Sequence, residues 1–348
     1  MYPALAVLQA DKSRDIEVLW VGSDDGIEAD LVKRAGIAYR GISAAGLHGV
    51  NVFSLPKRVG KLAKGYISAG KIIKEFAPDV MFFTGGYVGA PVAMAGKGIP
   101  SVLFVPDIEP GMALNQLAKN ADVIAVVCED SVRNFPDSSK IKITGYPTRT
   151  DIQRWNREEA MQYFRLHNES PVLFVFGGSK GAHSINMALR ANLPEVLNKC
   201  QVIHITGQTD WEDMHAFYNT LPDDQRMKYK IFPYLHEEMG AAFSVADLII
   251  SRAGASTLGE FPLFGVPAVL VPYPYAWRYQ KTNADYLVSK NAALMVKDED
   301  LPAQMVPVLT DLLGHPEKLA EMKAAMSRLA MPDAARNIME IIRSTARK

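Results

Sequence analysis

Short β-branched or aromatic apolar runs alternate along this chain with longer amphipathic segments. Such runs, when helical segments separate them, predict parallel sheets built from βαβ units, because a buried parallel strand is apolar on both faces. The alternation continues through most of the chain, so we expect an α/β fold. The expected strands are residues 16–21, 80–83, 101–105, 123–127, 172–176, 202–205, 248–250 and 268–271.

The chain has 348 residues, which suggests about two domains on a prior of roughly 150 residues each. A polar stretch follows Pro147 and leads into a new helix–strand series, so we place the boundary near residues 148–157. This predicts one domain at residues 1–150 and a second at residues 151–348. The second should end in helices from Leu301 onward, where several prolines stand near possible helix starts.

Charge and cysteine content exclude several classes of protein. The chain carries 38 basic and 38 acidic side chains, so no overall field attracts nucleic acid and we expect no nucleic-acid partner. Cys128 and Cys200 are too few for a disulfide framework or a zinc cluster, and they fit a reducing compartment. No apolar run approaches the roughly 18 residues of a membrane span, and no secretory signal is visible. We therefore expect a cytoplasmic protein.

The beginning of the chain departs from this pattern. Residues 3–8 read as the first turns of a helix, and no strand stands before them. A doubly wound domain normally opens with a strand and a turn. We therefore expect the opening strand and its turn to be missing from this sequence.

A glycine-rich turn joins the expected strand at 172–176 to a helix. Gly177, Gly178 and Gly181 allow a tight turn, and the helix start offers free N–H groups to a phosphate, to which Ser179 adds a hydroxyl. The spacing is that of neither the P-loop nor the dinucleotide-binding motif. A turn that needs glycine only for its dihedral angles explains this segment equally well. His183 follows the turn and could reach a bound diphosphate, although a surface or capping role is commoner for such a histidine.

A second strand-to-helix turn spans residues 250–260. Small and hydroxyl residues stand at its mouth, and Glu260 lies one turn inside the helix, where a carboxylate can accept hydrogen bonds from the two hydroxyls of a ribose. Alternatively, Glu260 simply complements the helix dipole. The later polar segment at 278–284, taken alone, reads as a surface loop.

Together these segments resemble the MurG-type transferases of glycosyltransferase family 28. The resemblance implies a GT-B fold, in which two Rossmann-like parallel-sheet domains flank an interdomain cleft. Several separated matches in the same order are more specific than any single glycine turn. The matching segments are residues 19–31, 41–49, 78–91, 144–151, 177–182, 252–260 and 278–284.

The resemblance implies an enzyme of peptidoglycan synthesis that moves N-acetylglucosamine from UDP onto a muramoyl-pentapeptide carried by undecaprenyl diphosphate. The transfer inverts the anomeric carbon and requires no metal or cofactor. Glu260 is implied to bind the ribose, Gln280 the sugar and Leu235 the uracil. The full implied donor site is Arg149, Gly177, Gly178, Ser179, Leu235, Ala255, Ser256, Thr257, Glu260 and Gln280. The implied acceptor site is Gly85, Gly86, Tyr87 and Asp107.

This chain departs from the family pattern at several points. The family's catalytic histidine would fall immediately before Met1, so no base is assigned and His48 is the first substitute. Residues 104–107 replace a family His-Glu-Gln-Asn motif, which leaves the acceptor open. Tyr279 stands where the family has a second glutamine. The string at 298–300 reads as a helix cap rather than a metal site.

Three alternatives therefore remain. One keeps the fold and the donor but transfers to another lipid or glycan acceptor. Another is a nucleotide-sugar-binding protein without transferase activity, suggested by the missing first turn. The third is a sugar-nucleotide epimerase of the same fold, which needs only the donor site.

A basic segment precedes the expected strand at 80–83. Apolar residues recur at roughly helical spacing between residues 57 and 76, which predicts a basic amphipathic helix that holds the protein on an anionic membrane surface. Each basic group contributes about 1 kcal/mol there, so we expect a peripheral protein at the cytoplasmic face of the cell membrane. Alternatively, the apolar stripe packs in the domain core. The basic residues are Lys57, Arg58, Lys61, Lys64, Lys71 and Lys74.

Overall fold

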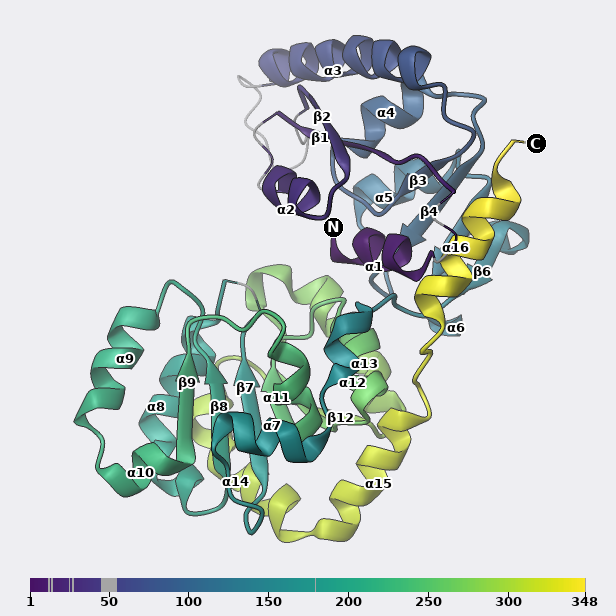
Figure 1. Cartoon of the computed structure of the whole chain (residues 1–348). Coiled ribbons are helices and arrows are strands. Elements are labelled where there is room, and N and C mark those ends of the chain that lie inside the picture. Colours follow the sequence, from purple (N-terminus) through teal and green to yellow (C-terminus); the bar gives the residue numbers. More distant parts are fainter. Residues whose placement is uncertain are drawn as a thin grey trace. The chain divides into compact units, whose positions relative to one another are not determined.

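The computed structural model describes residues 1–11, 13, 15–24, 26, 28–44, 55–178 and 180–347, with the side chains of residues 55–59, 276 and 277 excepted. The chain forms two compact units (Figure 1). The first unit comprises Met1–Arg149 together with Asp333–Lys348, and the second comprises Thr150–Pro332. Every strand pair in the described residues is parallel, so the expected α/β class is confirmed.

In the part of the chain that the structure describes, the second unit contains one six-stranded sheet with the order β12-β11-β10-β7-β8-β9. The chain runs outward from β7 through β8 to β9, then crosses back and continues outward from β10 on the other side. The order therefore reverses between β7 and β10, where Leu173 pairs with Leu248. The strands are β7 (Val172–Phe176), β8 (Gln201–Ile205), β9 (Tyr229–Phe232), β10 (Leu248–Ser251), β11 (Ala268–Leu270) and β12 (Ala293–Met295).

Helices cover both faces of this sheet. They are α7 (Arg157–Phe164), α8 (His183–Leu197), α9 (Trp211–Thr220), α10 (Asp223–Lys228), α11 (Met239–Val245), α12 (Thr257–Phe264), α13 (Trp277–Ser289), α14 (Leu301–Gly314) and α15 (Pro316–Ser327), with 3₁₀ turns η3 (Thr150–Arg154) and η4 (Pro274–Ala276). Successive residues of a strand point to opposite faces, and β7 shows this clearly. Leu173 and Val175 join an aliphatic cluster with α8 and α14, whereas Phe174 and Phe176 pack against Phe243 on the other face. The central strand is thus buried on both sides, as its apolar run predicts.

The first unit contains two separate sheets in the described residues, one of β1 and β2 and one with the order β3-β4-β5-β6. The strands are β1 (Leu19–Ser23), β2 (Ala38–Ile42), β3 (Met81–Phe83), β4 (Ser101–Val105), β5 (Val123–Val126) and β6 (Ile141–Ile143). The helices are α1 (Tyr2–Ala10), α2 (Glu28–Arg34), α3 (Leu55–Phe76), α4 (Gly89–Ala95), α5 (Met112–Ala118), α6 (Glu129–Val132), the 3₁₀ turn η2 (Ser138–Lys140) and α16 (Ala334–Thr345). Among the described helices, none is both long enough and apolar enough to span a membrane.

The opening helix α1 is buried in the first unit. Pro3, Leu5 and Val7 are buried, and burial also lowers the pKa of the Met1 amino group. Within the described residues, β1 pairs only with β2, and β3 pairs only with β4. Each of these two strands therefore has an edge without a strand partner.

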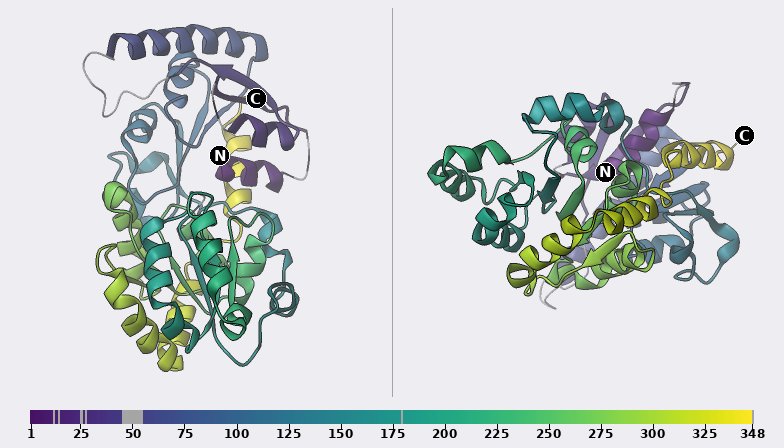
Figure 2. Two further views of the ribbon diagram at one scale, coloured as in Figure 1. Left: turned by 90° about the vertical axis from the view of Figure 1, so that its left-hand side faces the viewer. Right: turned by 90° about the horizontal axis from the view of Figure 1, so that it is seen from below.

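The carboxy-terminal helix corrects the expected domain limits. Residues 333–348 were assigned to the second domain, but α16 lies beside α1 and β4 in the first unit (Figures 1 and 2). The helix is amphipathic and buries Ile338 and Met339 there. An apolar stripe of this kind reveals that a helix is packed, but not on which unit.

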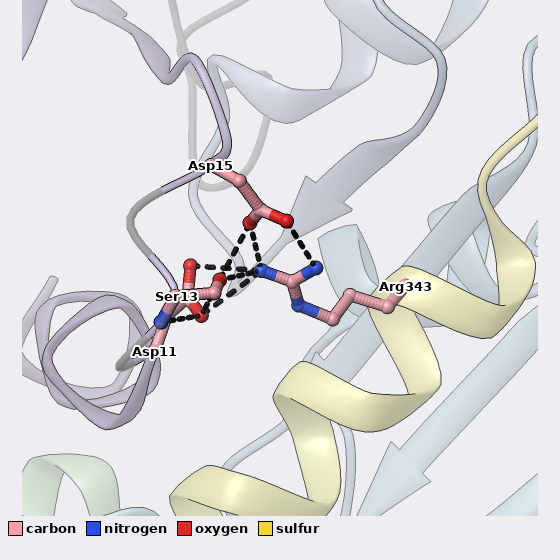
Figure 3. Close-up of polar contacts among 4 residues, drawn as sticks. All are labelled: Asp11, Ser13, Asp15 and Arg343. Carbon is pink, nitrogen blue, oxygen red and sulfur yellow. Dashed lines mark hydrogen bonds and ion pairs between the residues drawn. The ribbon is translucent and has the colours of Figure 1, made fainter.

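A polar cluster ties α16 to the segment that follows α1 (Figure 3). Arg343 donates to both carboxylate oxygens of Asp11, at 3.0 and 3.1 Å, and also to Asp15 and to the Ser13 hydroxyl. Hydrogen bonds from Ser13 and from the Arg343 guanidinium hold the pKa of Asp11 below its ordinary value, and the same two groups lower the pKa of Asp15. The two ends of the first unit are therefore joined by charge as well as by apolar packing.

Candidate functional site

The switch between β7 and β10 identifies a candidate site in the second unit. All strands of this sheet are parallel, so the loops that follow them lie at one edge. In open parallel sheets, ligands bind at this edge, where the strand order reverses. The glycine turn of residues 177–182 follows β7, and the turn of residues 252–256 follows β10. Both turns singled out from the sequence therefore flank the same point.

The glycine turn needs its glycines for its backbone dihedral angles and for close packing against neighbouring backbone. Gly178 and Gly181 have φ angles of +90° and +81°. A Cβ on Gly177 would lie 2.3 Å from the Ala182 nitrogen, and one on Gly181 would lie 2.2 Å from the Thr206 carbonyl oxygen. The turn is therefore packed tightly against the start of α8 and the end of β8. Ser179 lies outside the described residues.

In the second turn, the hydroxyl of Thr257 faces its own backbone. It donates to the Gly254 carbonyl oxygen at 2.7 Å, and the Thr257 side chain is buried. Ala255, Ser256 and Glu260 are partly exposed, with Glu260 in the first turn of α12. Of the two hydroxyls in this turn, that of Ser256 is therefore the more accessible to a ligand.

A largely buried arginine connects several loops at this edge of the sheet. Arg252 donates to the Val271 carbonyl oxygen at 3.0 Å, to the Ser184 hydroxyl at 2.7 Å and to the Asp298 carboxylate. It thereby connects the ends of β10 and β11, the start of α8 and the loop after β12. Asp298 belongs to the acidic string at 298–300. In the structure its carboxylate pairs with Arg252 and accepts from the Ser184 hydroxyl. Asp300 occupies the N-cap position of α14 but makes no side-chain cap hydrogen bond, which corrects the expectation of a side-chain cap.

Two further predicted donor residues lie at the same edge. Leu235 is buried in the loop after β9. The side-chain oxygen of Gln280 accepts from the Tyr273 N–H at 2.8 Å, which fixes the orientation of its amide. The Gln280 amide nitrogen is therefore the group that remains to donate to a ligand. Arg149 is the last residue of the first unit, where its guanidinium stacks 5.5 Å from the centre of the Tyr2 ring.

A buried polar network behind the glycine turn was missed by the sequence analysis. His204 in β8, Asn186 in α8 and Tyr229 in β9 are fully buried and hydrogen-bonded to one another. Burial lowers the pKa of His204 to about 3, so its imidazole is neutral. The signal in the sequence was a histidine inside an apolar strand, but its partners are too distant along the chain to be recognised by spacing. Within the described residues, no group of three or more His, Cys, Asp or Glu side chains is placed to hold a metal ion.

The predicted acceptor residues follow strands of the first unit. Gly85 and Gly86 have φ angles of +110° and +89° directly after β3, and Tyr87 is exposed beside them. Asp107 follows β4. Phe104, from the segment that departs from the family motif, is fully buried in β4 and packs edge-on against Tyr146. At this position of the motif the chain therefore places an aromatic ring in the core of the sheet.

The basic helix α3 divides its apolar stripe between two environments. A Cβ on Gly65 would lie 2.1 Å from the Ser43 carbonyl oxygen, so this face packs closely on the unit, and Ile73 joins its core. Tyr66 and Ile67 face outward, with 46% and 59% of their surface exposed. The lysines on the described part of this helix that are exposed are Lys61, Lys64, Lys71 and Lys74. The side chains of Lys57 and Arg58, and the whole of His48, lie outside the described residues.

Comparisons with known families agree with this architecture. Residues 1–126 match the glycosyltransferase family 28 N-terminal domain, and residues 172–338 match the family's C-terminal domain. The chain therefore belongs to glycosyltransferase family 28, and its predicted GT-B fold with two Rossmann-like units is confirmed.

Individual relatives extend this result. A protein of Desulforamulus reducens is 36% identical over 98% of this chain and 94% of its own length, and one of Halothermothrix orenii is 35% identical over 100% and 96%. Both are named UDP-N-acetylglucosamine–N-acetylmuramyl-(pentapeptide) pyrophosphoryl-undecaprenol N-acetylglucosamine transferase.

Solved structures show the same fold. The crystal structure of Acinetobacter baumannii MurG is 28% identical, has a TM-score of 0.78 and matches 99% of this chain and 95% of its own. A UDP-GlcNAc 2-epimerase from Neisseria meningitidis, bound to UDP-GlcNAc, matches 99% of this chain and 96% of its own with a TM-score of 0.68, but at 13% identity. At that identity the epimerase shares the fold alone.

Proposed function

We propose that this chain is an inverting glycosyltransferase that moves N-acetylglucosamine from UDP-N-acetylglucosamine to the lipid-linked muramoyl-pentapeptide of peptidoglycan synthesis. The observation that carries this proposal is the edge of the second sheet. There the glycine turn follows β7, the turn that leads to Glu260 follows β10, and the Gln280 amide is held by the Tyr273 N–H after β11. The family and the printed names of the relatives give this donor and this acceptor.

In this reaction the acceptor hydroxyl attacks the anomeric carbon from the face opposite UDP. A new C–O bond forms, the bond to the diphosphate breaks, and UDP leaves with the negative charge. The amino ends of α8 and α12 lie beside the two turns and stabilise that charge with backbone N–H groups and helix dipoles. The carboxylate of Glu260 accepts from the ribose hydroxyls, and the Gln280 amide nitrogen donates to the sugar. The attacking hydroxyl must also lose a proton, and we assign no base among the described residues.

The first unit supplies the acceptor side in this proposal. Gly85, Gly86 and Tyr87 form a turn after β3 in which Gly86 and Tyr87 are exposed, and Asp107 follows the neighbouring strand β4. Tyr66 and Ile67 on α3 stand among exposed lysines, a combination that favours an anionic bilayer surface. Each lysine near such a surface contributes about 1 kcal/mol. We infer peripheral binding to the cytoplasmic face of the membrane that carries the acceptor.

A second candidate is a UDP-sugar-binding protein without transferase activity. It requires only the donor residues of the second unit, whose two turns flank one switch point. A different lipid or glycan acceptor for the same donor also remains a candidate, since residues 104–107 differ from the family motif.

Calorimetry with UDP-N-acetylglucosamine tests the donor site. Glu260→Ala should weaken binding about tenfold, because a charged hydrogen-bond acceptor for the ribose is lost. Glu321→Ala, at an exposed glutamate on α15, is the matched control and should bind normally. Binding that is absent, or unchanged in Glu260→Ala, would overturn the proposal. Transfer to lipid-linked muramoyl-pentapeptide and to other lipid acceptors then separates the candidates.

A further inference from the structure

The residue after the glycine turn is His183, and its imidazole contacts a largely buried carboxylate. His183 is the first residue of α8, and 72% of its side chain is exposed. Its Nδ1 lies 3.0 Å from Oδ1 of Asp210, whose side chain is only 10% exposed. The next residue, Ser184, is held by Arg252 and Asp298. The first turn of α8 is therefore fixed at both of these side chains.

Asp210 is itself held by a fully buried asparagine. The Asn186 amide nitrogen lies 2.7 Å from Oδ2 of Asp210 and 2.8 Å from the Thr206 carbonyl oxygen. A carbonyl oxygen can only accept, and an amide nitrogen has two hydrogens to give. The Asn186 nitrogen therefore serves both partners, and its side-chain oxygen points to His204.

The remaining protons follow from this arrangement. The Asn186 oxygen can only accept, so Nε2 of His204, at 2.9 Å, carries a hydrogen. His204 is neutral, so its Nδ1 accepts from the Tyr229 hydroxyl at 2.7 Å. The buried chain from Tyr229 to Asp210 thus has a single assignment of donors and acceptors. In it the Asp210 carboxylate accepts from Asn186 at Oδ2.

This assignment determines what His183 presents to solvent. Because the Asp210 carboxylate accepts, Nδ1 of His183 donates to it, and Nε2 lies on the exposed side of the ring. The imidazolium form can then donate from Nε2 while Nδ1–H stays on Asp210. A charge-assisted hydrogen bond to a phosphate oxygen is stronger than a neutral one.

We propose that His183 binds the diphosphate of the sugar donor through Nε2, and that Asp210 is the positioning residue that orients its imidazole. This inference rests on the proposed function, because it places a UDP-sugar at the glycine turn. In its imidazolium form, His183 adds a side-chain donor at Nε2 to the backbone N–H groups of the turn.

Calorimetry with uridine and UDP separates this proposal from the proposed function. His183→Ala should weaken UDP binding by about tenfold or more but leave uridine binding within about twofold, because uridine has no phosphate. Its side chain is exposed, so the variant should fold. His315→Ala is the matched control, since His315 is also exposed and hydrogen-bonds to the carbonyl oxygen of Asp311.

The outcomes are distinguishable. Equal UDP affinity in the wild type and His183→Ala would overturn the role of His183 and leave the donor site intact. Loss of both uridine and UDP binding in His183→Ala would also overturn it, because the effect would not be specific for phosphate. If the wild type binds neither ligand, the proposed function itself fails.

Nitrogen-15 NMR of the histidine rings tests the positioning role of Asp210. In the wild type, neutral His183 should be the Nδ1–H tautomer. In Asp210→Asn, the buried Asn186 nitrogen still requires an acceptor, so the new amide should turn its oxygen to Asn186 and its nitrogen to His183. Neutral His183 should then switch to the Nε2–H tautomer. A wild-type Nε2–H tautomer would contradict the assignment, even if Asp210→Asn does not fold.

Discussion

The two units differ in how completely their parallel sheets are joined. In the second unit, six described strands form one sheet, and the loops after β7 and β10 flank its switch point. In the first unit, β1 and β3 belong to separate sheets, and each lacks a partner strand on one side within the described residues. The difference teaches that one continuous sheet brings both turns of the second unit to a single switch point, whereas the predicted acceptor residues of the first unit follow strands of a smaller sheet.

The largest expected effect comes from filling the open edges of the first unit. An added extension at the amino terminus, with a strand, a glycine turn and a histidine, should raise turnover on the order of 100-fold, because it supplies a positioned base. UDP affinity should hardly change, since both turns of the proposed donor site belong to the second unit. The measurement is kcat with a lipid-linked acceptor.

The same extension with alanine in place of its histidine is the control for this experiment. It should fill the edge without supplying the base, so turnover should stay low. No gain from the histidine form would favour the binding protein without transferase activity.

Glycine substitutions compare the turn after β7 in the second unit with the turn after β3 in the first unit. Gly181→Ala should reduce UDP affinity by more than tenfold and destabilise the protein by about 1–3 kcal/mol, because the new Cβ meets a backbone oxygen at a positive φ. Gly85→Ala, whose Cβ would meet Leu114 only at 3.6 Å, should impair transfer without weakening UDP binding. Calorimetry and steady-state kinetics measure both. A UDP defect as large in Gly85→Ala would contradict the separation of the two sites.

The buried histidine should make the second unit sensitive to acid. The pKa of His204 is about 3 when folded and about 6.5 when unfolded, so the unfolded state binds more protons between these values. The free energy of unfolding should therefore fall by about 1.4 kcal/mol between about pH 7.5 and pH 5.5.

Urea unfolding at the two pH values measures this change. In a Trp20→Phe background, the remaining tryptophans Trp155, Trp211 and Trp277 all belong to the second unit, so their fluorescence reports on it. His204→Gln is the control and should lose this part of the pH dependence. An unchanged pH dependence in that variant would show that other groups cause it.

The smallest expected effect concerns the Arg343 cluster of the first unit (Figure 3). Arg343→Ala should speed hydrogen exchange of the α16 amides modestly, and added salt should reduce the difference because exposed charges are screened. The pKa values of Asp11 and Asp15 are lowered in the fold, so their stabilisation is present above about pH 4 and is lost as the pH falls further.

Arg336→Ala is the control for Arg343, because Arg336 lies on the same helix and pairs locally with the N-cap residue Asp333 and with Glu340. Its effect on exchange should be smaller. Equal effects of the two substitutions would show that the cluster does not hold α16.

Sequence patterns located most of the second sheet and both of its turns, because fully buried parallel strands are apolar and strand-to-helix turns need glycine. They did not reveal that α16 packs on the first unit, since its stripe of Ile338 and Met339 does not identify its partner. The network of Asn186 and His204 was missed because a buried polar side chain is explained only by partners that the fold brings to it. That the Thr257 hydroxyl donates to its own backbone could likewise not be predicted, because residue spacing does not give the direction of a side chain.

Hydrogen exchange in the presence of UDP-N-acetylglucosamine tests the central claim most directly. If the two turns of the second unit hold the donor, the ligand should protect amides in the loops after β7 and β10 and in the first turns of α8 and α12. Protection confined to the first unit, or absent at saturating ligand, would contradict the account.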